Sequence, residues 1–328
     1  MSDPQHIDQQ LHTDRTPDPQ LAFVFPGQGS QSLGMLAELA QANPIIAETF
    51  AEASSGAGTD LWVLSQSGPD AQLNQTEFTQ PALLAAGVAV WRLWQARGGA
   101  LPARLAGHSL GEYSALVAAG VLGLADAARL VRLRGQLMQD AAPPGTGAMA
   151  AVLGAEDALV REVCEAASGK EVVVPANYNS PGQIVIGGHA AAVDKALTAL
   201  AERGVRKAVK LAVSVPSHTP LMRDAADKLA EAMAGIEWSS PRLPVVQNVD
   251  AQVQADTDAI RDALVRQLYL PVQWTGCVQA LVAGGASRIA ECGPGKVLAG
   301  LVKRIDKSVD ARALGATADF DAALEDWK

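Results

Sequence analysis

The chain has 328 residues, of which 48% are hydrophobic and 19% charged, and its formal net charge is −9. This composition supports a sizeable core and argues against global disorder. An acidic chain is a poor general nucleic-acid binder, because phosphate contacts need a basic face. The length favours one large domain, or one domain that carries a smaller inserted one.

The N-terminal segment, residues 1–20, is polar and lacks periodic apolar residues. We expect a disordered leader there, with His6 and His12 in solvent. The segment also lacks the apolar centre of a secretory signal. The longest apolar run, residues 81–91, is too short to span a bilayer.

The cysteines are scattered along the chain at Cys164, Cys277 and Cys292, without C-x-x-C spacing. This pattern is typical of unpaired thiols in a reducing compartment. We therefore expect a cytoplasmic protein that contacts neither membrane nor nucleic acid.

The first part of the chain alternates short apolar runs with helical patterns. A strand at 21–25 is stopped by Pro26-Gly27, which indicates a tight loop. Further along, the patterns predict a strand at 103–106 and helices at 33–50, 80–96, 109–122 and 126–140.

A proline- and glycine-rich break at 142–147 separates this part from a segment with a different order of predicted strands and helices. After it we predict a strand at 148–153, a helix at 155–168, strands at 172–178 and 183–188, a helix at 189–203 and a strand at 206–211. This β-α-β-β-α-β order is the ferredoxin-like signature, so residues 142–213 are expected to form an insert. The remainder, 21–141 and 214–328, then forms one larger α/β part, with a helix to 234, a strand near 245 and a final strand at 288–291.

The segment Gly107-His108-Ser109-Leu110-Gly111 follows a predicted strand and opens a predicted helix. Gly-x-Ser-x-Gly in that context is the nucleophile-elbow pattern, in which a sharp turn lifts the serine hydroxyl clear of the sheet. The start of the helix favours developing negative charge. We therefore predict that Ser109 is the nucleophile of an enzyme that moves acyl groups.

A serine hydroxyl needs a base, and the chain holds five histidines. Two lie in the leader, His108 points away from an elbow serine, and His189 opens a helix of the insert. His218 is left as the predicted base. No acid follows in a recognisable pattern, so either a backbone carbonyl or an amide could orient the imidazole.

Seven segments, in order along residues 21–314, resemble one family: the malonyl-CoA:acyl carrier protein transacylases of bacterial type II fatty-acid synthesis. The most specific are FPGQGSQ at 25–31 and GHSLGEY at 107–113. The others lie at 132–135, 214–218, 247–249, 267–274 and 291–295.

The resemblance implies an α/β-hydrolase-like part with a ferredoxin-like insert. It implies a ping-pong transfer of malonyl from coenzyme A to the phosphopantetheine thiol of acyl carrier protein, with no metal and no cofactor besides the thioester substrate. Six residues receive roles by this resemblance: Ser109 is acylated, His218 is the base, Gln28 and Leu110 supply oxyanion-hole N–H groups, Arg134 holds the malonyl carboxylate, and the Gln267 carbonyl orients the histidine.

Three other readings remain open at this level: a hydrolase of the same architecture, a transacylase for another acyl group or for polyketide synthesis, and a non-catalytic docking subunit. We expect a monomer. An acidic carrier protein would need a local basic patch for docking. Two clusters qualify: Arg203, Arg206, Lys207 and Lys210 on the insert, and Lys296, Lys303, Arg304 and Lys307 near the C-terminus.

Overall fold

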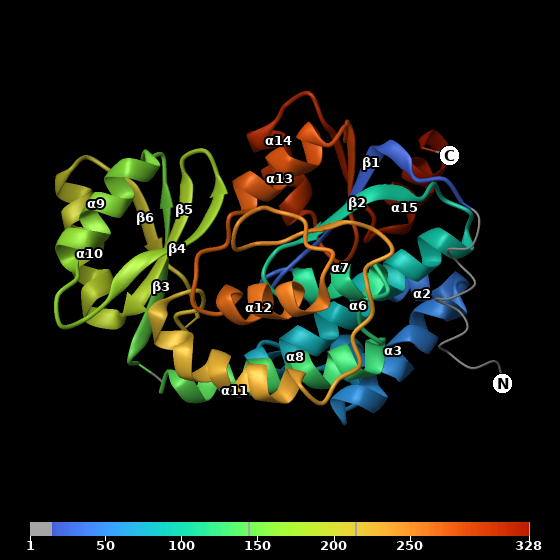
Figure 1. Cartoon of the computed structure of the whole chain (residues 1–328), viewed down its shortest axis with the longest axis horizontal. Helices are drawn as coiled ribbons and strands as arrows, with labels where there is room; N and C mark the ends of the chain where they lie inside the picture. The colour runs from blue at the N-terminus through green and yellow to red at the C-terminus, as the bar shows by residue number, and fades with distance from the viewer. Residues whose placement is uncertain (1–14, 144, 214, 328) are drawn as a thin grey trace.

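The computed structural model describes residues 15–143, 145–213 and 215–327. In Figure 1, a smaller antiparallel sheet with its two helices lies at one end of the molecule, beside a larger body built on a parallel sheet. This arrangement confirms the predicted mixed α/β class. None of the helices in the described ranges combines the length and hydrophobicity needed to cross a membrane.

Within the described residues, the large sheet has five parallel strands in the order β7-β2-β1-β8-β9. Their bounds are β1 (Asp18–Phe25), β2 (Pro102–Gly107), β7 (Val245–Val246), β8 (Arg288–Glu291) and β9 (Asp310–Ala313). The run Leu21–Phe25 in β1 is fully buried, as expected for a parallel strand with both faces covered. Phe23 packs into one core with the long helices, whereas Ala22 and Val24 face a second core.

Two strand predictions are corrected at the ends of the chain. β1 begins at Asp18, inside the segment expected to be a disordered leader, because the Asp18 N–H donates to Leu101 O at 2.7 Å and its carboxylate pairs with Arg288 at 2.5 Å. Residues 1–14 of that leader, with His6 and His12, lie outside the described residues. The strand at 288–291 is not the last, since β9 follows and pairs with it.

Helices cover both faces of the parallel sheet (Figure 1). One face carries α6 (Thr76–Ala96), which is buried almost all round and contains the apolar run 81–91. The bounds of the other helices in this part are α2 (Ala37–Ala42), α3 (Pro44–Ala57), α4 (Leu61–Ser67), α5 (Asp70–Leu73), α7 (Gly111–Ala118), α8 (Leu124–Ala141), the 3₁₀ turn η1 (Pro220–Met222), α11 (Arg223–Met233), α12 (Thr257–Gln267), α13 (Trp274–Ala283), α14 (Val297–Ile305) and α15 (Thr317–Asp326).

The predicted helix at 33–50 is two helices, α2 and α3. Asn43 has an extended backbone and Pro44 is the first residue of α3. A residue before proline avoids the helical region, and proline suits the first helical position, so the break falls there. The patterns of α4, α5, α12, α13, α14 and α15 were not assigned from the sequence.

The small sheet is antiparallel with the strand order β4-β5-β3-β6. Its strands are β3 (Gly147–Leu153), β4 (Val173–Ser180), β5 (Gln183–His189) and β6 (Lys207–Lys210), and its helices are α9 (Asp157–Ala167) and α10 (Ala190–Glu202). The order of these strands and helices along the chain, and the way the strands pair, match the predicted ferredoxin-like unit. The Tyr178 N–H of β4 donates to Val272 O at 2.9 Å, which attaches this sheet beside α13 of the larger part.

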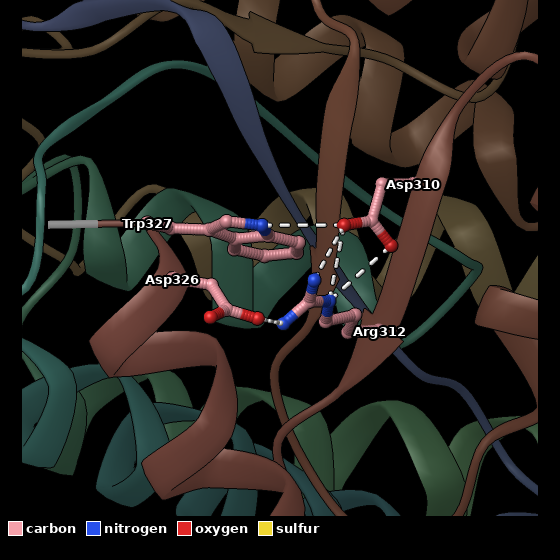
Figure 2. Close-up of polar contacts among 4 residues, drawn as sticks. All are labelled: Asp310, Arg312, Asp326 and Trp327. Atoms are coloured by element: carbon pink, nitrogen blue, oxygen red, sulfur yellow. Dashed lines mark hydrogen bonds and ion pairs between the residues drawn. The ribbon is translucent and has the colours of Figure 1, made fainter.

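The C-terminal helix is held to the edge of the parallel sheet by a polar cluster (Figure 2). Arg312 of β9 binds Asp310 at 2.8 Å and Asp326 of α15 at 2.6 Å. Trp327 donates its indole N–H to Asp310 at 3.3 Å, and the Arg312 guanidinium lies 4.8 Å from the Trp327 ring centre. The cluster therefore fixes α15 against the outer strand.

Candidate active site

The elbow around Ser109 is a tight turn between β2 and α7. Ser109 has φ of 52°, a left-handed backbone that a side chain rarely adopts. A Cβ on Gly107 would lie 1.9 Å from Gly111 C, and one on Gly111 would lie 2.0 Å from Phe25 O. Because the chain crowds at both positions, glycine is required there. Ser109 itself stays half-buried at the turn.

Ser109 meets His218 across 109 residues of sequence. The Ser109 hydroxyl donates to His218 Nε2 at 2.8 Å. On the other side of the ring, His218 Nδ1 lies 2.6 Å from the backbone oxygen of Gln267. A carbonyl can only accept, so Nδ1 carries the proton and Nε2 is free to take one. The sequence left open whether a backbone carbonyl or an amide orients the imidazole. In the structure the group beside Nδ1 is a backbone carbonyl.

The His218 imidazole is buried. Burial lowers its pKa to about 3, and the nearby charge of Arg134 acts in the same direction. The ring is therefore neutral near pH 7, which is the form that a general base requires.

Arg134 of α8 lies in the interior, with 1% of its surface exposed. Its Nη2 donates to Ser109 Oγ at 3.3 Å and to Gln267 Oε1 at 3.0 Å, and its Nη1 donates to Gln80 Oε1 at 2.8 Å. Its guanidinium also lies 5.6 Å from the ring centre of Tyr113. The structure thus brings Arg134 and Gln267 to Ser109.

The charge of Arg134 has neutral hydrogen-bond partners. Within the described residues it forms no ion pair with a carboxylate, and its Nε has no hydrogen-bond partner. Burial lowers the pKa of this guanidinium, yet arginine stays protonated in proteins. A buried cation held by neutral amides next to the elbow serine is suited to receive an anionic group from a substrate.

Gln28 and Leu110 lie in loops at the same edge of the sheet. β1 and β2 run parallel, and the His108 N–H donates to Phe25 O at 2.9 Å, which holds the two loops together. Leu110 is the N-cap residue of α7, and the exposed Gln28 follows β1 in a turn. Their roles as oxyanion donors stay a prediction.

Three residues that the sequence did not assign to the site also lie here: Gln80, Glu112 and Asn248. Asn248 Oδ1 accepts from the Ser109 N–H at 2.7 Å, and Glu112 is buried beside it. Glu112 and Asn248 lie within the motif segments at 107–113 and 247–249, so the motifs could have pointed to them. Gln80 had no sequence feature that indicated a site, only its place in a predicted helix. His108 turns away from the dyad, and its Nε2 lies 2.8 Å from Asn179 Oδ1 of β4.

No cluster of three or more potential metal ligands occurs in the part of the chain that the structure describes. All three cysteines are buried, and burial raises the pKa of each thiol. They are therefore protonated near neutral pH and poor nucleophiles.

This α/β scaffold, with an elbow serine beside a neutral histidine and a buried arginine, is that of an acyltransferase. The family model described as "Acyl transferase domain" matches residues 22–317. The malonyl CoA-acyl carrier protein transacylase of Salmonella typhimurium is 57% identical over 305 residues, which are 93% of this chain and 99% of that protein. The chain therefore belongs to the malonyl-CoA:acyl carrier protein transacylase family, as its motifs indicated.

Solved structures agree with this assignment. A malonyl-CoA:acyl carrier protein transacylase from Xanthomonas oryzae pv. oryzae superposes with a TM-score of 0.95 at 74% identity, covering 95% of this chain and 99% of that one. A malonyl-transacylase in complex with its type II PKS acyl-carrier protein gives a TM-score of 0.92 at 53% identity, covering 94% of this chain and 99% of that one. The fold class predicted from the sequence is confirmed.

Proposed function

We propose that this chain transfers a malonyl group from coenzyme A to the phosphopantetheine thiol of an acyl carrier protein, through a malonyl ester on Ser109, in fatty-acid biosynthesis. The observation that carries the proposal is the buried Arg134, whose Nη2 lies 3.3 Å from Ser109 Oγ. A malonyl carboxylate is only two bonds from the thioester carbonyl carbon. A cation at this place therefore selects an acyl group that ends in a carboxylate.

The chemistry proceeds in two matched halves. His218 takes the proton of Ser109 as Oγ bonds to the thioester carbonyl carbon, and the Gln28 and Leu110 N–H groups stabilise the oxyanion. The C–S bond breaks, and the imidazolium returns its proton to the coenzyme A thiolate. The carrier thiol then attacks the ester, and the same steps run in reverse to free Ser109.

Arg134 supplies the specificity. Its planar guanidinium can form two parallel hydrogen bonds with the malonyl carboxylate. An acetyl group would leave this buried cation without an anionic partner, which penalises the uncharged substrate. Gln80 and Gln267 hold the guanidinium in place through their side-chain oxygens.

The acyl carrier protein is the proposed macromolecular partner, and the complex known for the related malonyl-transacylase supports it. We further propose that the chain acts as a cytoplasmic monomer, without a metal and with no nucleic-acid or membrane contact. The catalytic part comprises 21–141 and 214–328, and the insert comprises 142–213. One of the two basic clusters docks the carrier protein.

The test is the intact mass of the protein after mixing with malonyl-CoA. We expect one malonyl adduct, which is absent in Ser109→Ala and which carrier protein removes with formation of malonyl-carrier protein. Loss of the adduct to water at the same rate without carrier protein would identify a hydrolase instead. An adduct that persists in Ser109→Ala would place the nucleophile elsewhere.

A further inference from the structure

Glu112 is a fully buried acid that the proposed reaction does not use. It lies three residues after the nucleophile, in the first turn of α7. Its Oε2 accepts from Gln267 Nε2 at 2.9 Å and from the Asn248 N–H at 2.9 Å. Its Oε1 has no hydrogen-bond partner within the described residues. Both partners of Glu112 come from distant parts of the chain and contact the active site themselves.

The Gln267 side chain joins three parts of the site. Its Nε2 also donates to the Ser109 carbonyl at 3.0 Å, and its Oε1 accepts from Arg134 Nη2 at 3.0 Å. The backbone oxygen of the same residue accepts from His218 Nδ1. A rotation of this amide therefore disturbs the nucleophile and the guanidinium, and a shift of its backbone disturbs the histidine.

Asn248 holds the other side of the elbow. Its Oδ1 accepts from the Ser109 N–H at 2.7 Å, and its Nδ2 donates to the Gly107 carbonyl at 2.7 Å. Together, Asn248 and Gln267 bind both backbone groups of Ser109, the residue with the left-handed backbone. Such a conformation persists where the surrounding contacts determine it.

Glu112, together with the Ser109 carbonyl, specifies which way the Gln267 amide faces. A guanidinium only donates hydrogen bonds, so it requires the amide oxygen, and Glu112 Oε2 acts as an acceptor, so it requires the amide nitrogen. Arg134 and Glu112 on opposite ends of the amide thus specify one orientation. Without the Glu112 side chain, the amide nitrogen loses its 2.9 Å hydrogen bond and keeps the Ser109 carbonyl at 3.0 Å and Asn248 Oδ1 at 3.5 Å, so the amide is held less firmly.

We infer that Glu112 is a positioning residue for acyl transfer. Its carboxyl group fixes the Gln267 amide and the Asn248 backbone, and these two residues in turn keep Ser109, His218 and Arg134 in the relative positions that the reaction needs. This inference rests on the function proposed above. It predicts two separable effects of losing the carboxylate. A displaced Arg134 raises the KM for malonyl-CoA, and a displaced Ser109–His218 pair lowers kcat for every acyl group.

The experiment compares Glu112→Leu, which removes the acceptor, with Glu112→Gln, which keeps an acceptor oxygen at the same length. Glu291 provides matched controls, because it is also fully buried but accepts from the Ala299 N–H of α14 at 2.8 Å, away from the dyad. Glu291→Leu and Glu291→Gln therefore report the cost of changing a buried acid alone. Rates are divided by the concentration of active sites, taken from the malonyl adduct in intact mass spectra.

For Glu112→Leu we expect kcat/KM for malonyl transfer to fall about 100-fold, the size of effect produced by small misplacements of reacting groups. Glu112→Gln is expected to recover part of the loss and to lie about ten-fold below the wild type, since its amide still accepts from both donors. In both variants the KM for malonyl-CoA rises, whereas the KM for acetyl-CoA stays the same. The Glu291 variants keep wild-type constants per active site.

Wild-type kcat and KM in Glu112→Leu would overturn the inference, as would equal losses in the Glu112 and Glu291 variants. If Glu112→Leu does not fold, Glu112→Gln decides, and wild-type constants there overturn the inference. Failure of the proposed function gives a different result, because the wild type itself would then form no adduct on Ser109.

Discussion

Arg134 Nη2 donates a hydrogen bond to Ser109 Oγ over 3.3 Å, so the buried cation touches the proposed nucleophile itself. The same guanidinium has neutral side-chain partners and is 1% exposed. The proposed function therefore places charge recognition by Arg134 and bond formation at Ser109 within one hydrogen bond of each other. This proximity ties the identity of the acyl group to the reaction.

Replacing Arg134 by alanine should abolish malonyl transfer and spare part of the transfer of uncharged acyl groups. Removing one partner of a buried ion pair costs about 3–5 kcal/mol, which corresponds to roughly 100- to 5,000-fold in kcat/KM. Steady-state kinetics with malonyl-CoA and acetyl-CoA measure the change. Arg129→Ala is the control, because that arginine is exposed on the same helix and pairs with Asp126. Unchanged malonyl kinetics in Arg134→Ala would refute the assignment.

The pKa of His218, lowered to about 3, predicts that this histidine stays neutral well below pH 6. The neutral ring is the active base, and protonation would remove it only as the pH falls towards 3. NMR of imidazole nitrogens, with assignment from His218→Gln, should show the Nδ1-protonated neutral tautomer from pH 8 to pH 5. A His218 titration midpoint near 6.5 would contradict this expectation. The same variant should lower kcat about 100- to 10,000-fold.

Gly111→Ala should destabilise the fold and impair the elbow. The added Cβ would lie 2.0 Å from Phe25 O, so β1 or α7 must shift. We expect a loss of about 1–3 kcal/mol or more in the free energy of unfolding, measured in urea. Gly300→Ala is the matched control, since nothing lies within 4 Å of its Cβ in α14, and alanine there should add up to about 1 kcal/mol. Equal stability of the two variants would contradict the steric argument.

The two basic clusters are expected to differ in carrier-protein docking. On the insert, Arg203 pairs with Glu162 and Lys210 with Asp194, which offsets part of the positive charge. In the C-terminal cluster, no carboxylate pairs with Lys303 or Lys307 among the described residues.

Because uncompensated charge steers an acidic partner more strongly, Lys303→Glu with Lys307→Glu should raise the carrier-protein KM about ten-fold and flatten its salt dependence. Arg206→Glu with Lys207→Glu should have the smaller effect. The KM for malonyl-CoA, measured in parallel, separates docking from coenzyme A binding. If both double variants keep the KM and salt dependence of the wild type, neither cluster is the docking site.

Glu112 should make stability depend on pH. Burial raises its pKa from 4.5 to about 7, although its bonds to Gln267 and Asn248 and the charge of Arg134 oppose the shift. Between these values the native state holds a proton that the unfolded chain has lost, so the contribution of Glu112 is complete below pH 4.5 and disappears as the pH rises through 7.

The variant Glu112→Gln lacks this titration. Its free energy of unfolding, relative to the wild type, should therefore rise from pH 4.5 to pH 7 and level off above. Taking the difference removes the opposing contribution of His218, which both proteins share. Urea unfolding at pH 5, 6, 7 and 8 gives the curves, and two parallel curves would contradict the raised pKa.

Local sequence signals were sufficient for the elbow and for the element order of the insert. Gly107 and Gly111 flank Ser109 where the backbones of β1, β2 and α7 crowd, so the requirement for glycine can be read from the pattern. The β-α-β-β-α-β order of 148–211 follows from the change between two-residue and 3.6-residue periods. The break between α2 and α3 was missed although Pro44 marks it, because the apolar period continues across the break.

The environment of Arg134 could not be obtained in this way. By spacing it belongs with Arg129 and Arg132 on one helix, and such arginines usually face solvent. The family motifs pointed to its role, but its burial depends on α6 and α12, which supply Gln80 and Gln267. The residues alone also left open which group orients His218, since a backbone atom carries no sequence signature, and only the family resemblance pointed to the Gln267 carbonyl.

The sequence by itself determined the fold class and the family and was sufficient to predict the nucleophile and its base, because these depend on short motifs and on periodic burial. The tertiary structure alone decided how the site is held together. Ser109 meets His218 over 109 residues and Gln267 over 158, and Glu112 bonds Asn248 over 136. Contacts at such separations arise from the packing of whole elements, and the chemistry of any one residue does not specify which partner the fold will bring to it.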